Sequence, residues 1–389
     1  MARPSAELST AQSEPSGNAQ TAPRQKRFRL PRLQEAGLVL VIVALGLLLT
    51  FAGGNITIRG HLVNNFFRPD NLLTNVLTPM SWMAIMAVGV TTVIVAGGID
   101  ISVGSIFGLA ALSCAAVLQH MDEAAPAWKV LPIAVLVPCG VGLICGLING
   151  GLVVGLRMHP FIVTLSTMSI FRGIALVAVK SGSLPESGLA LPTAFTNDFM
   201  MYSIRYAPVG KLPVNLQPAP TVAMLLVMVA GAIYLGLSIM GRENYAVGGN
   251  EEAARFSGIR VGMVKLRVYA ISGLCAGIAA MVSCGYYGSA ATNTGEGYEL
   301  MVIAAAVVGG ASLSGGRGTA LGALLGAMVI QLIDNGIFIL KQVNFGLFEL
   351  SLRKEYSKII IGIAIILAVS VDRLSEYLRN RRARGRADG

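Results

Sequence analysis

The sequence predicts an all-α polytopic membrane protein with about ten transmembrane helices, built as two duplicated halves with helix breaks at glycine-rich segments. The first observation is composition, because 54% of the residues are hydrophobic and only 13% are charged, against about 25% charged residues in soluble domains. The second is a series of uncharged runs as long as a bilayer span, which takes roughly 20 apolar residues. Such runs occupy 36–58, 71–99, 130–156, 212–241 and 268–295. The third is a glycine-rich pattern that occurs twice.

Shorter apolar runs complete the series of expected spans. They occupy 101–119, 161–179, 300–316, 318–333 and 359–371. The last run is short for a span, and it depends on Lys358 and Asp372 reaching the interface with their polar ends. Together with the long runs, they define a transmembrane domain over 34–372.

Basic residues mark the expected orientation. The chain has 30 Lys and Arg against 20 Asp and Glu, a formal net charge of +10. The excess collects in the tail 1–33, in the connection 241–265 and in the tail 373–389. Because positive residues favour the cytoplasmic side and an even number of spans returns the chain to its starting side, we expect both termini in the cytoplasm. The tail 1–33 is also rich in Ser, Ala, Pro and Gln, which predicts disorder. This basicity indicates membrane topology, and nucleic acid is not an expected partner.

The other long connections are expected on the outer side. The longest is 181–219, whose prolines exclude a continuous span. The segments 119–129 and 289–299 carry more acidic than basic residues, as an outer position predicts. The basic segment 341–358 is the exception, because the same count of spans also places it outside.

The glycine-rich pattern pairs Gly97–Ser105 with Gly309–Arg317. The identical positions are Gly97/Gly309, Gly98/Gly310, Ser102/Ser314 and Gly104/Gly316. Each copy lies between two apolar runs, so each predicts a helix, a break and a second helix, an arrangement common in transporters built from repeats. Coincidence among 46 glycines is the alternative.

Polar residues in the two copies are candidates for function. In the first copy the candidates are Gly98, Asp100 and Ser102. Asp100 is a carboxylate that lies between two apolar runs. A carboxylate is costly in hydrocarbon, so Asp100 should face a water-filled cavity, a helix end or a partner. One hypothesis is a pathway or gating element, and the alternative is a structural cap at the cytoplasmic interface. The same two interpretations apply to Ser312, Ser314 and Arg317 in the second copy, and a positive residue that marks the cytoplasmic side is a further alternative for Arg317.

Further polar residues fall inside or near the ends of expected spans. These are Asn149, Arg172, Asp334 and Asn335. Amide groups both donate and accept hydrogen bonds, which suits transient contact with a hydroxylated substrate. We predict that these residues line a pathway. The alternative is that they form hydrogen bonds between helices. For Arg172, a further alternative is that its guanidinium group pairs with a carboxylate or extends to the membrane interface.

The connection 241–265 contains a short charged motif. Its pattern predicts a short helix over Glu251–Phe256 that is ended by a glycine able to take positive φ. On the inner face of a membrane protein, a short charged helix suits contact with another protein, and an ordinary solvated loop is the alternative. The residues of the motif are Glu251, Glu252, Ala253, Ala254, Arg255 and Gly258.

The sequence predicts no catalytic, metal or cofactor site. The three histidines are dispersed and the five cysteines all lie inside apolar runs. A phosphate-binding Gly-x-x-x-x-Gly-Lys-Ser/Thr segment is absent from the sequence. We therefore expect a protein that is not an enzyme and has no ATPase site of its own.

Four segments, in this order, resemble the ribose-type permease family of bacterial ABC sugar importers. They lie within 96–105, 159–173, 246–259 and 297–318, and the similarity extends from about residue 35 to about residue 372. The resemblance implies a permease in the inner membrane, paired with a cytoplasmic ATPase subunit, a periplasmic sugar-binding protein and a second copy of itself. It also implies that the charged motif at 251–258 docks onto the ATPase.

Two other kinds of transporter remain open. The branched-chain amino-acid permeases are related and share glycine-rich breaks. An ion-coupled secondary transporter would need carboxylates near the bilayer midplane, and Asp100 and Asp334 are the candidates. The resemblance favours a sugar importer, with ribose-like pentoses, hexoses and polyols all open as substrates.

Overall fold

The computed structural model describes residues 33–58, 60–206 and 214–340, together with separate positions between 356 and 370. Apart from Leu33, the two predicted tails 1–33 and 373–389 lie outside the described residues. So does nearly all of the basic segment 341–358, and the predicted span 359–371 is described only in part.

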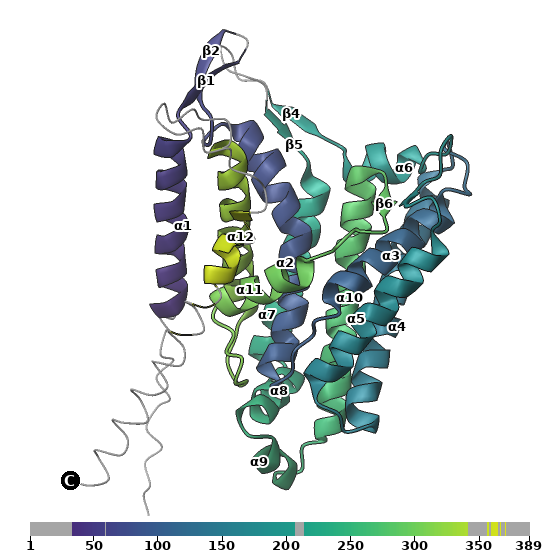
Figure 1. Cartoon of the computed structure of the whole chain (residues 1–389), viewed down its shortest axis with the longest axis vertical. Helices are drawn as coiled ribbons and strands as arrows, with labels where there is room; N and C mark the ends of the chain where they lie inside the picture. The colour runs from purple at the N-terminus through teal and green to yellow at the C-terminus, as the bar shows by residue number, and fades with distance from the viewer. Residues whose placement is uncertain are drawn as a thin grey trace, which may run out of the picture.

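Helices make up most of the described structure (Figure 1). Seven helical segments are long and apolar enough to cross a bilayer. They are α1 Leu33–Ala52, η1 Asn71–Leu77 continuing into α2 Thr78–Val95, α4 Ala127–Gly155, α5 Pro160–Ala178, α7 Pro218–Leu237, α10 Val261–Tyr287 and α12 Ala320–Leu340. Two apolar helices are shorter, α3 Val103–Leu118 and α11 Tyr298–Val308. Each of these helices coincides with a predicted apolar run, so the prediction of an all-α polytopic membrane protein is confirmed.

The connecting elements gather at two ends of the bundle. One end carries the hairpins β1 Asn55–Ile58 with β2 His61–Asn64 and β4 Ile204–Tyr206 with β5 Val214–Leu216, as well as α6 Thr193–Phe195 and η2 Thr196–Met200 (Figure 1). The opposite end carries α8 Ile239–Gly249 and α9 Glu251–Phe256, and α1 begins at this end (Figure 1). A third antiparallel pair, β3 Ser183–Leu184 with β6 Ala290–Ala291, joins the connection after α5 to the one after α10.

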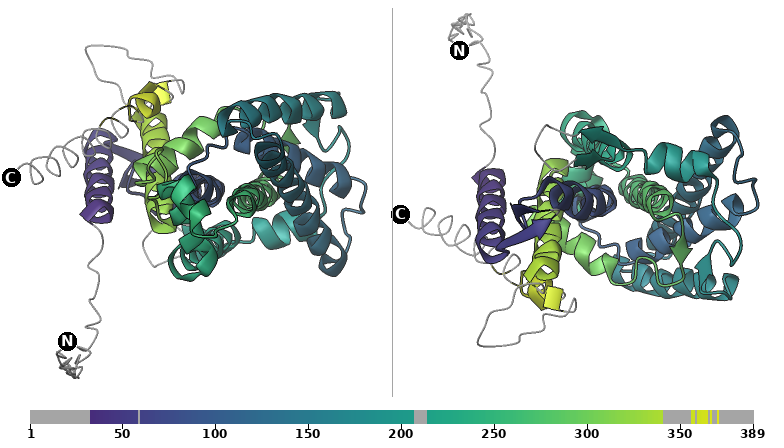
Figure 2. Two further views of the ribbon diagram at one scale, coloured as in Figure 1. Left: turned by 90° about the horizontal axis from the view of Figure 1, so that it is seen from below. Right: turned by 90° about the horizontal axis from the view of Figure 1, so that it is seen from above.

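Helix α2 forms the centre of the bundle. Its transmembrane stretch is 94% buried and that of α10 is 78% buried, against 11% for α1 and 17% for α7. Helix α2 packs against α7, α10, α11 and α12. The two end-on views in Figure 2 show α1 at the edge of the bundle. Helices α1 and α7, followed by α4 and α5 at 28% each, therefore expose the most apolar surface, as contact with lipid requires.

Helix α10 approaches α4 closely because glycines face each other. A Cβ atom at Gly142 would collide with the carbonyl oxygen of Gly273, and one at Gly277 would collide with that of Pro138. Small residues of this kind let two helix backbones come together inside a membrane. This contact fixes α10, which in turn supports α2 and α3.

The connection between α10 and α11, predicted over 289–299 on the outer side, runs partly into the bundle, while its β6 strand pairs with β3 of the connection after α5. Backbone oxygens of Thr294 and Gly295 lie against Gly108 and Gly104 of α3, so the segment enters the bundle. Helix α11 has only 11 residues, or about 16 Å at 1.5 Å per residue, half of the ~30 Å hydrocarbon core. Helix α11 therefore starts inside the bundle, and its acidic approach segment is held there by contacts that charge counting does not reveal.

Candidate functional site

The predicted short helix over Glu251–Phe256 is confirmed as α9. Its start is capped by Asn250, whose side chain accepts a hydrogen bond from the Ala253 amide at 2.9 Å. Its end is a Schellman motif around Gly258, which has φ +84°. The Gly258 amide donates to Arg255 O at 3.0 Å and the Ile259 amide donates to Ala254 O at 3.1 Å.

One side of α9 is attached to the bundle and the other is exposed. Ala254 is buried among Val247 of α8 and Val261 of α10. The Glu251 carboxylate accepts from Lys265 at 2.8 Å and from Arg255 at 3.3 Å. On the opposite side, Glu252 and Ala253 are exposed, and Phe256 is 85% exposed. An aromatic side chain at the tip of a charged helix is typical of a protein contact surface.

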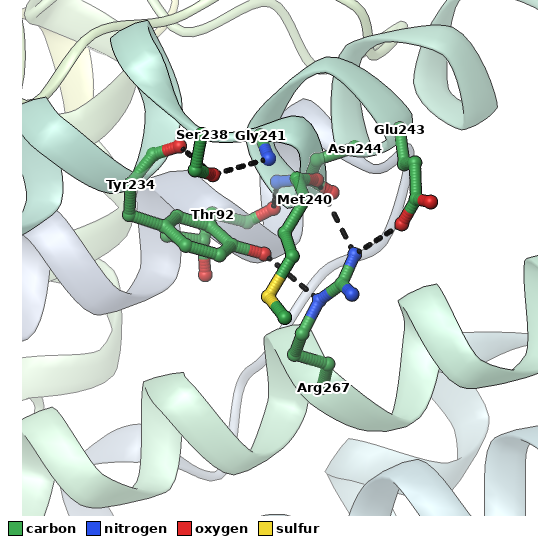
Figure 3. A network of polar contacts seen from close by, with 8 residues as sticks. All are labelled: Thr92, Tyr234, Ser238, Met240, Gly241, Glu243, Asn244 and Arg267. Carbon is green, nitrogen blue, oxygen red and sulfur yellow. Dashed lines mark hydrogen bonds and ion pairs between the residues drawn. The ribbon is translucent and has the colours of Figure 1, made fainter.

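Helix α8 is tied to its neighbours by the polar network in Figure 3. Ser238 caps α8 by accepting from the Gly241 amide at 2.8 Å. Arg267 of α10 donates to Glu243 Oε2 at 3.0 Å and to the Tyr234 hydroxyl of α7 at 3.3 Å. Helices α7, α8 and α10 are thereby connected through one guanidinium group.

The same helix touches both glycine-rich breaks. We define the first break as 96–102, between α2 and α3, and the second break as 309–319, between α11 and α12. Asn244, fully buried, donates to Thr92 O in the last turn of α2 at 3.0 Å (Figure 3). Tyr245 donates through its hydroxyl to Gly318 O in the second break at 2.6 Å. Helix α8 therefore contacts the end of one broken helix and the start of the other.

The second break also contacts the end of α2 next to α8. The Gly316 amide of the second break donates to Val95 O, at the end of α2, at 2.9 Å. Gly248 of α8 lies in the same place, where a Cβ atom would collide with Val95 O and approach the Gly316 amide at 2.7 Å. The junction of α8 with the two breaks therefore has no room for a side chain at position 248.

The first break is closed by a buried carboxylate. Gly97, with φ +80°, ends α2 by donating to Ile94 O at 2.9 Å. Asp100 is fully buried, and its Oδ1 accepts from the Ser102 amide at 3.0 Å and hydroxyl at 2.6 Å. Its Oδ2 accepts from the Ser272 hydroxyl of α10 at 2.8 Å. Asn149 of α4 donates to the Ser102 hydroxyl at 2.7 Å. The first break is thus bound by side chains to α4 and α10.

The second break begins with the same turn as the first break and then differs from it. Gly310, with φ +94°, donates to Val307 O at 2.9 Å, and the Ala311 amide donates to Ala306 O at 2.9 Å. The left-handed glycine equivalent to Gly97 is therefore Gly310, one residue away from the predicted pairing with Gly309. Farther along, Ser312 is buried and Ser314 is exposed.

The remaining predicted residues, Arg172 of α5 and Asp334 and Asn335 of α12, contact different parts of the bundle. Arg172 donates to Thr292 O at 3.1 Å and to Thr294 O at 2.7 Å, holding the approach to α11. Asn335 exchanges two hydrogen bonds with Asn71 at the start of η1, at 3.0 and 3.1 Å. Asp334 Oδ1 is buried without a hydrogen-bond partner among the described residues. Asn149 and Asn335 sit in hydrogen bonds between helices, which favours the packing interpretation, and their pathway role stays a prediction.

Comparison with known proteins identifies the family to which this architecture belongs. The family model described as branched-chain amino acid transport system / permease component matches residues 72–369. The chain belongs to this permease family. The galactose/methyl galactoside import permease protein MglC of Escherichia coli K12 is 35% identical over 362 residues, covering 92% of this chain and 98% of the relative. The ribose import permease protein RbsC of Bacillus subtilis 168 is 37% identical over 311 residues, covering 79% and 86%. No solved structure matches the chain.

Membership in this permease family confirms the predicted resemblance and the prediction of a transport subunit that is not an enzyme. The described residues contain no group of three or more His, Cys, Asp or Glu that could hold a metal ion.

Sequence reasoning missed the residues by which this permease connects α9 to its breaks. Asn244, Tyr245 and Gly248 lie inside the polar connection 241–265, but their partners Thr92, Val95 and Gly318 are distant along the chain. Phe256 could have been recognised in the sequence as a candidate contact residue, because an aromatic residue beside two glutamates and an arginine is unusual for a solvated loop.

Proposed function

We propose that this permease is the membrane subunit of a binding-protein-dependent ABC importer that moves a monosaccharide across the inner membrane. The observation that carries the proposal is α9, which is rigidly attached on one side, exposed on the other and joined through α8 to both breaks. The named relatives import galactose, methyl galactoside and ribose, which favours a sugar over an amino acid. A cytoplasmic ATPase subunit and a periplasmic sugar-binding protein are the partners of such an importer.

The exposed side of α9 is the proposed contact with the ATPase. Phe256 supplies a large apolar anchor of the type that dominates interface energies, and Glu252 and Arg255 can form ion pairs around it. Ala253 lets the partner approach closely. Gly258 ends the helix, so the chain returns to α10 without covering this face.

Helix α8 is the proposed route from the ATPase into the bundle. A displacement of α9 acts on α8, because Ala254 and Val247 share one small core. Helix α8 in turn holds Thr92 through Asn244 and Gly318 through Tyr245. Closure of the ATPase would therefore move the end of α2 and the start of α12 together.

The α8–α9 end of the bundle supports the proposed orientation in the membrane. Its basic residues, Arg242, Arg255, Arg260 and Lys265, favour the cytoplasmic side. Because α1 begins at this end (Figure 1), we place the N-terminus in the cytoplasm, and an even number of spans puts the C-terminus there too. Within this scheme 34–372 is the permease domain, 241–265 the coupling loop and 181–219 the outer loop facing the binding protein.

A second copy of the chain is the proposed partner within the membrane. Helix α5 exposes Ser166 and Ser169, and Gly173 lies four residues after Ser169 with open space beside it. Small residues spaced four apart let helices associate closely in a membrane. We therefore propose that a homodimer interface runs along α5.

The function is tested by reconstituting the chain with its ATPase and binding protein in liposomes and measuring ATP hydrolysis over a panel of pentoses, hexoses and polyols. We expect one sugar to stimulate hydrolysis, and only when the binding protein is present. Stimulation by a branched-chain amino acid, or uptake by the chain alone on an ion gradient, would contradict the proposal. The second outcome would direct attention to Asp100 and Asp334.

Docking through α9 has its own test, the association of the permease with the ATPase subunit. Phe256→Ala should weaken association by about 30-fold, because an interface anchor contributes about 2 kcal/mol or more. Ser257→Ala, on the adjacent exposed position, is the matched control and should bind like the parent. Equal binding by both variants would contradict docking through Phe256.

A further inference from the structure

A cavity of about 700 Å³ lies at the α8–α9 end of the bundle, beside the second break. Its walls come from the beginning of α1, the last turns of α7, α8, the second break and the beginning of α12. The polar side chains in these walls are Glu35, Arg242, Tyr245, Arg317 and Thr319. The coupling route described above uses Tyr245 and none of the charged groups.

The cavity carries an excess of positive charge. Arg242 and Arg317 both line it, and Glu35 is the acidic residue among the lining residues. The Glu35 carboxylate accepts a hydrogen bond from the Thr319 hydroxyl at 3.2 Å, at the edge of α12. Arg242 forms no ion pair within the described ranges 33–58, 60–206 and 214–340, whereas Arg255, Lys265 and Arg267 at the same end all do. Two guanidinium groups in one cavity are suited to a phosphate, which they bind through planar, paired donors.

The surroundings of the arginines are apolar and membrane-facing. Ala232, Leu235 and Leu321 form part of the lining. Leu321 is 41% exposed, and Leu237, directly after the lining residue Gly236, is 73% exposed. Helices α1 and α7, which supply two of the walls, have the least buried transmembrane stretches of the described spans. A ligand in this cavity therefore meets positive charge inside and a hydrocarbon-facing surface beside it.

We propose that the cavity binds the headgroup of an anionic phospholipid from the leaflet on the α8–α9 side. The phosphate lies between Arg242 and Arg317, and the acyl chains run along the exposed apolar faces of α7 and α12. Basic cavities between transmembrane helices near the membrane surface recognise anionic headgroups in this way. A free phosphate shares the charge but lacks the acyl chains, so the two sources are distinguishable. The inference does not depend on which substrate the permease moves.

The test uses the full chain in detergent, titrated with short-chain phosphatidylglycerol, with phosphatidylcholine of equal chain length and with inorganic phosphate. Bound lipid is counted by native mass spectrometry, and thermal stabilisation is recorded in parallel. We expect phosphatidylglycerol to bind in preference to both other probes. Arg242→Gln and Arg317→Gln should each weaken it by about fivefold, since a basic residue near an anionic lipid contributes about 1 kcal/mol.

Arg260→Gln is the matched control, because Arg260 is an exposed arginine at the same end that does not line the cavity. It should bind phosphatidylglycerol like the parent chain. Equal binding of the two lipids, or an equal loss in Arg260→Gln, would overturn the proposal. Stabilisation by inorganic phosphate as strong as that by phosphatidylglycerol would also overturn it, because the acyl chains would then contribute nothing. The assay contains no ATPase or sugar, so its failure would be separate from a failure of the proposed import function.

Discussion

The first break and the second break end α2 and α11 with the same pair of backbone hydrogen bonds around a left-handed glycine, Gly97 or Gly310. Beyond that glycine they are held differently. The first break is fixed by Asp100, whose carboxylate receives hydrogen bonds from its own turn and from α10. Five of the eleven residues of the second break are glycines, and it contacts α2 and α8 through its own backbone, at Gly316 and Gly318.

The difference indicates that the two breaks, although they share one sequence pattern, have different roles. A break fixed through side chains to α4 and α10 keeps α3 in place relative to the core. In the proposed coupling, the second break, which contacts Tyr245 and Gly248, would follow a movement of α8. The copies therefore share the way a helix ends, and their separate roles come from what surrounds the chain after it ends.

Removal of the buried carboxylate should have the largest effect. Asp100→Ala would leave the amide and hydroxyl of Ser102 and the hydroxyl of Ser272 without their shared acceptor inside the bundle. We expect the free energy of unfolding to fall by about 3 kcal/mol, because buried polar groups lose their partners. Thermal unfolding of the purified chain measures this, with Ser314→Ala in the second break as the control. If the two variants unfolded at the same temperature, the distinction between the breaks would be lost.

A side chain at the junction of α8 and the breaks should have the next largest effect. Gly248→Ala places a Cβ atom against Val95 O, and overpacking of this kind costs about 1–3 kcal/mol. We expect sugar uptake per ATP hydrolysed to fall about tenfold, with ATPase association retained.

Gly249→Ala is the matched control for this substitution, because a Cβ atom at Gly249 meets nothing within 4 Å. It should transport sugar like the parent. Equal uptake by the two alanine variants would show that α8 does not depend on close contact with α2.

Loss of single hydrogen bonds from α8 should have the smallest effect. Asn244→Ala removes the contact with α2, and Tyr245→Phe removes the contact with the second break. Thr92 O keeps the Ala96 amide as a partner in the first variant, so the fold should persist. Each loss of about 1 kcal/mol should lower uptake per ATP about fivefold. A fall in one variant only would assign coupling to a single break.

Much of this arrangement could be predicted from the sequence, because apolar length and glycine position are local signals. The short helix Glu251–Phe256 and its end at Gly258 followed from one stretch of residues. The break after Val308 was readable too, but two adjacent glycines can both take positive φ, so the pairing of the copies was off by one residue.

The contacts that make the site were not readable, because they join distant parts of the chain. Asn244 and Thr92 are 152 residues apart, and nothing in the sequence distinguishes Gly248 from the other glycines. Arg172 holds the backbone at Thr292 and Thr294 inside the bundle, where the count of charges had placed an outer loop. Every residue type has a backbone carbonyl, so a side chain that binds one cannot be paired with its partner from the sequence.

A double-mutant cycle on uptake per ATP hydrolysed tests most directly whether α8 moves the end of α2 and the second break as one unit. The cycle compares Asn244→Ala, Tyr245→Phe and the double variant in the reconstituted importer. Because Gly316 is bonded to Val95 beside α8, we predict that the double variant loses little more than the worse single one. A loss equal to the product of the two single effects, about 25-fold, would contradict the account.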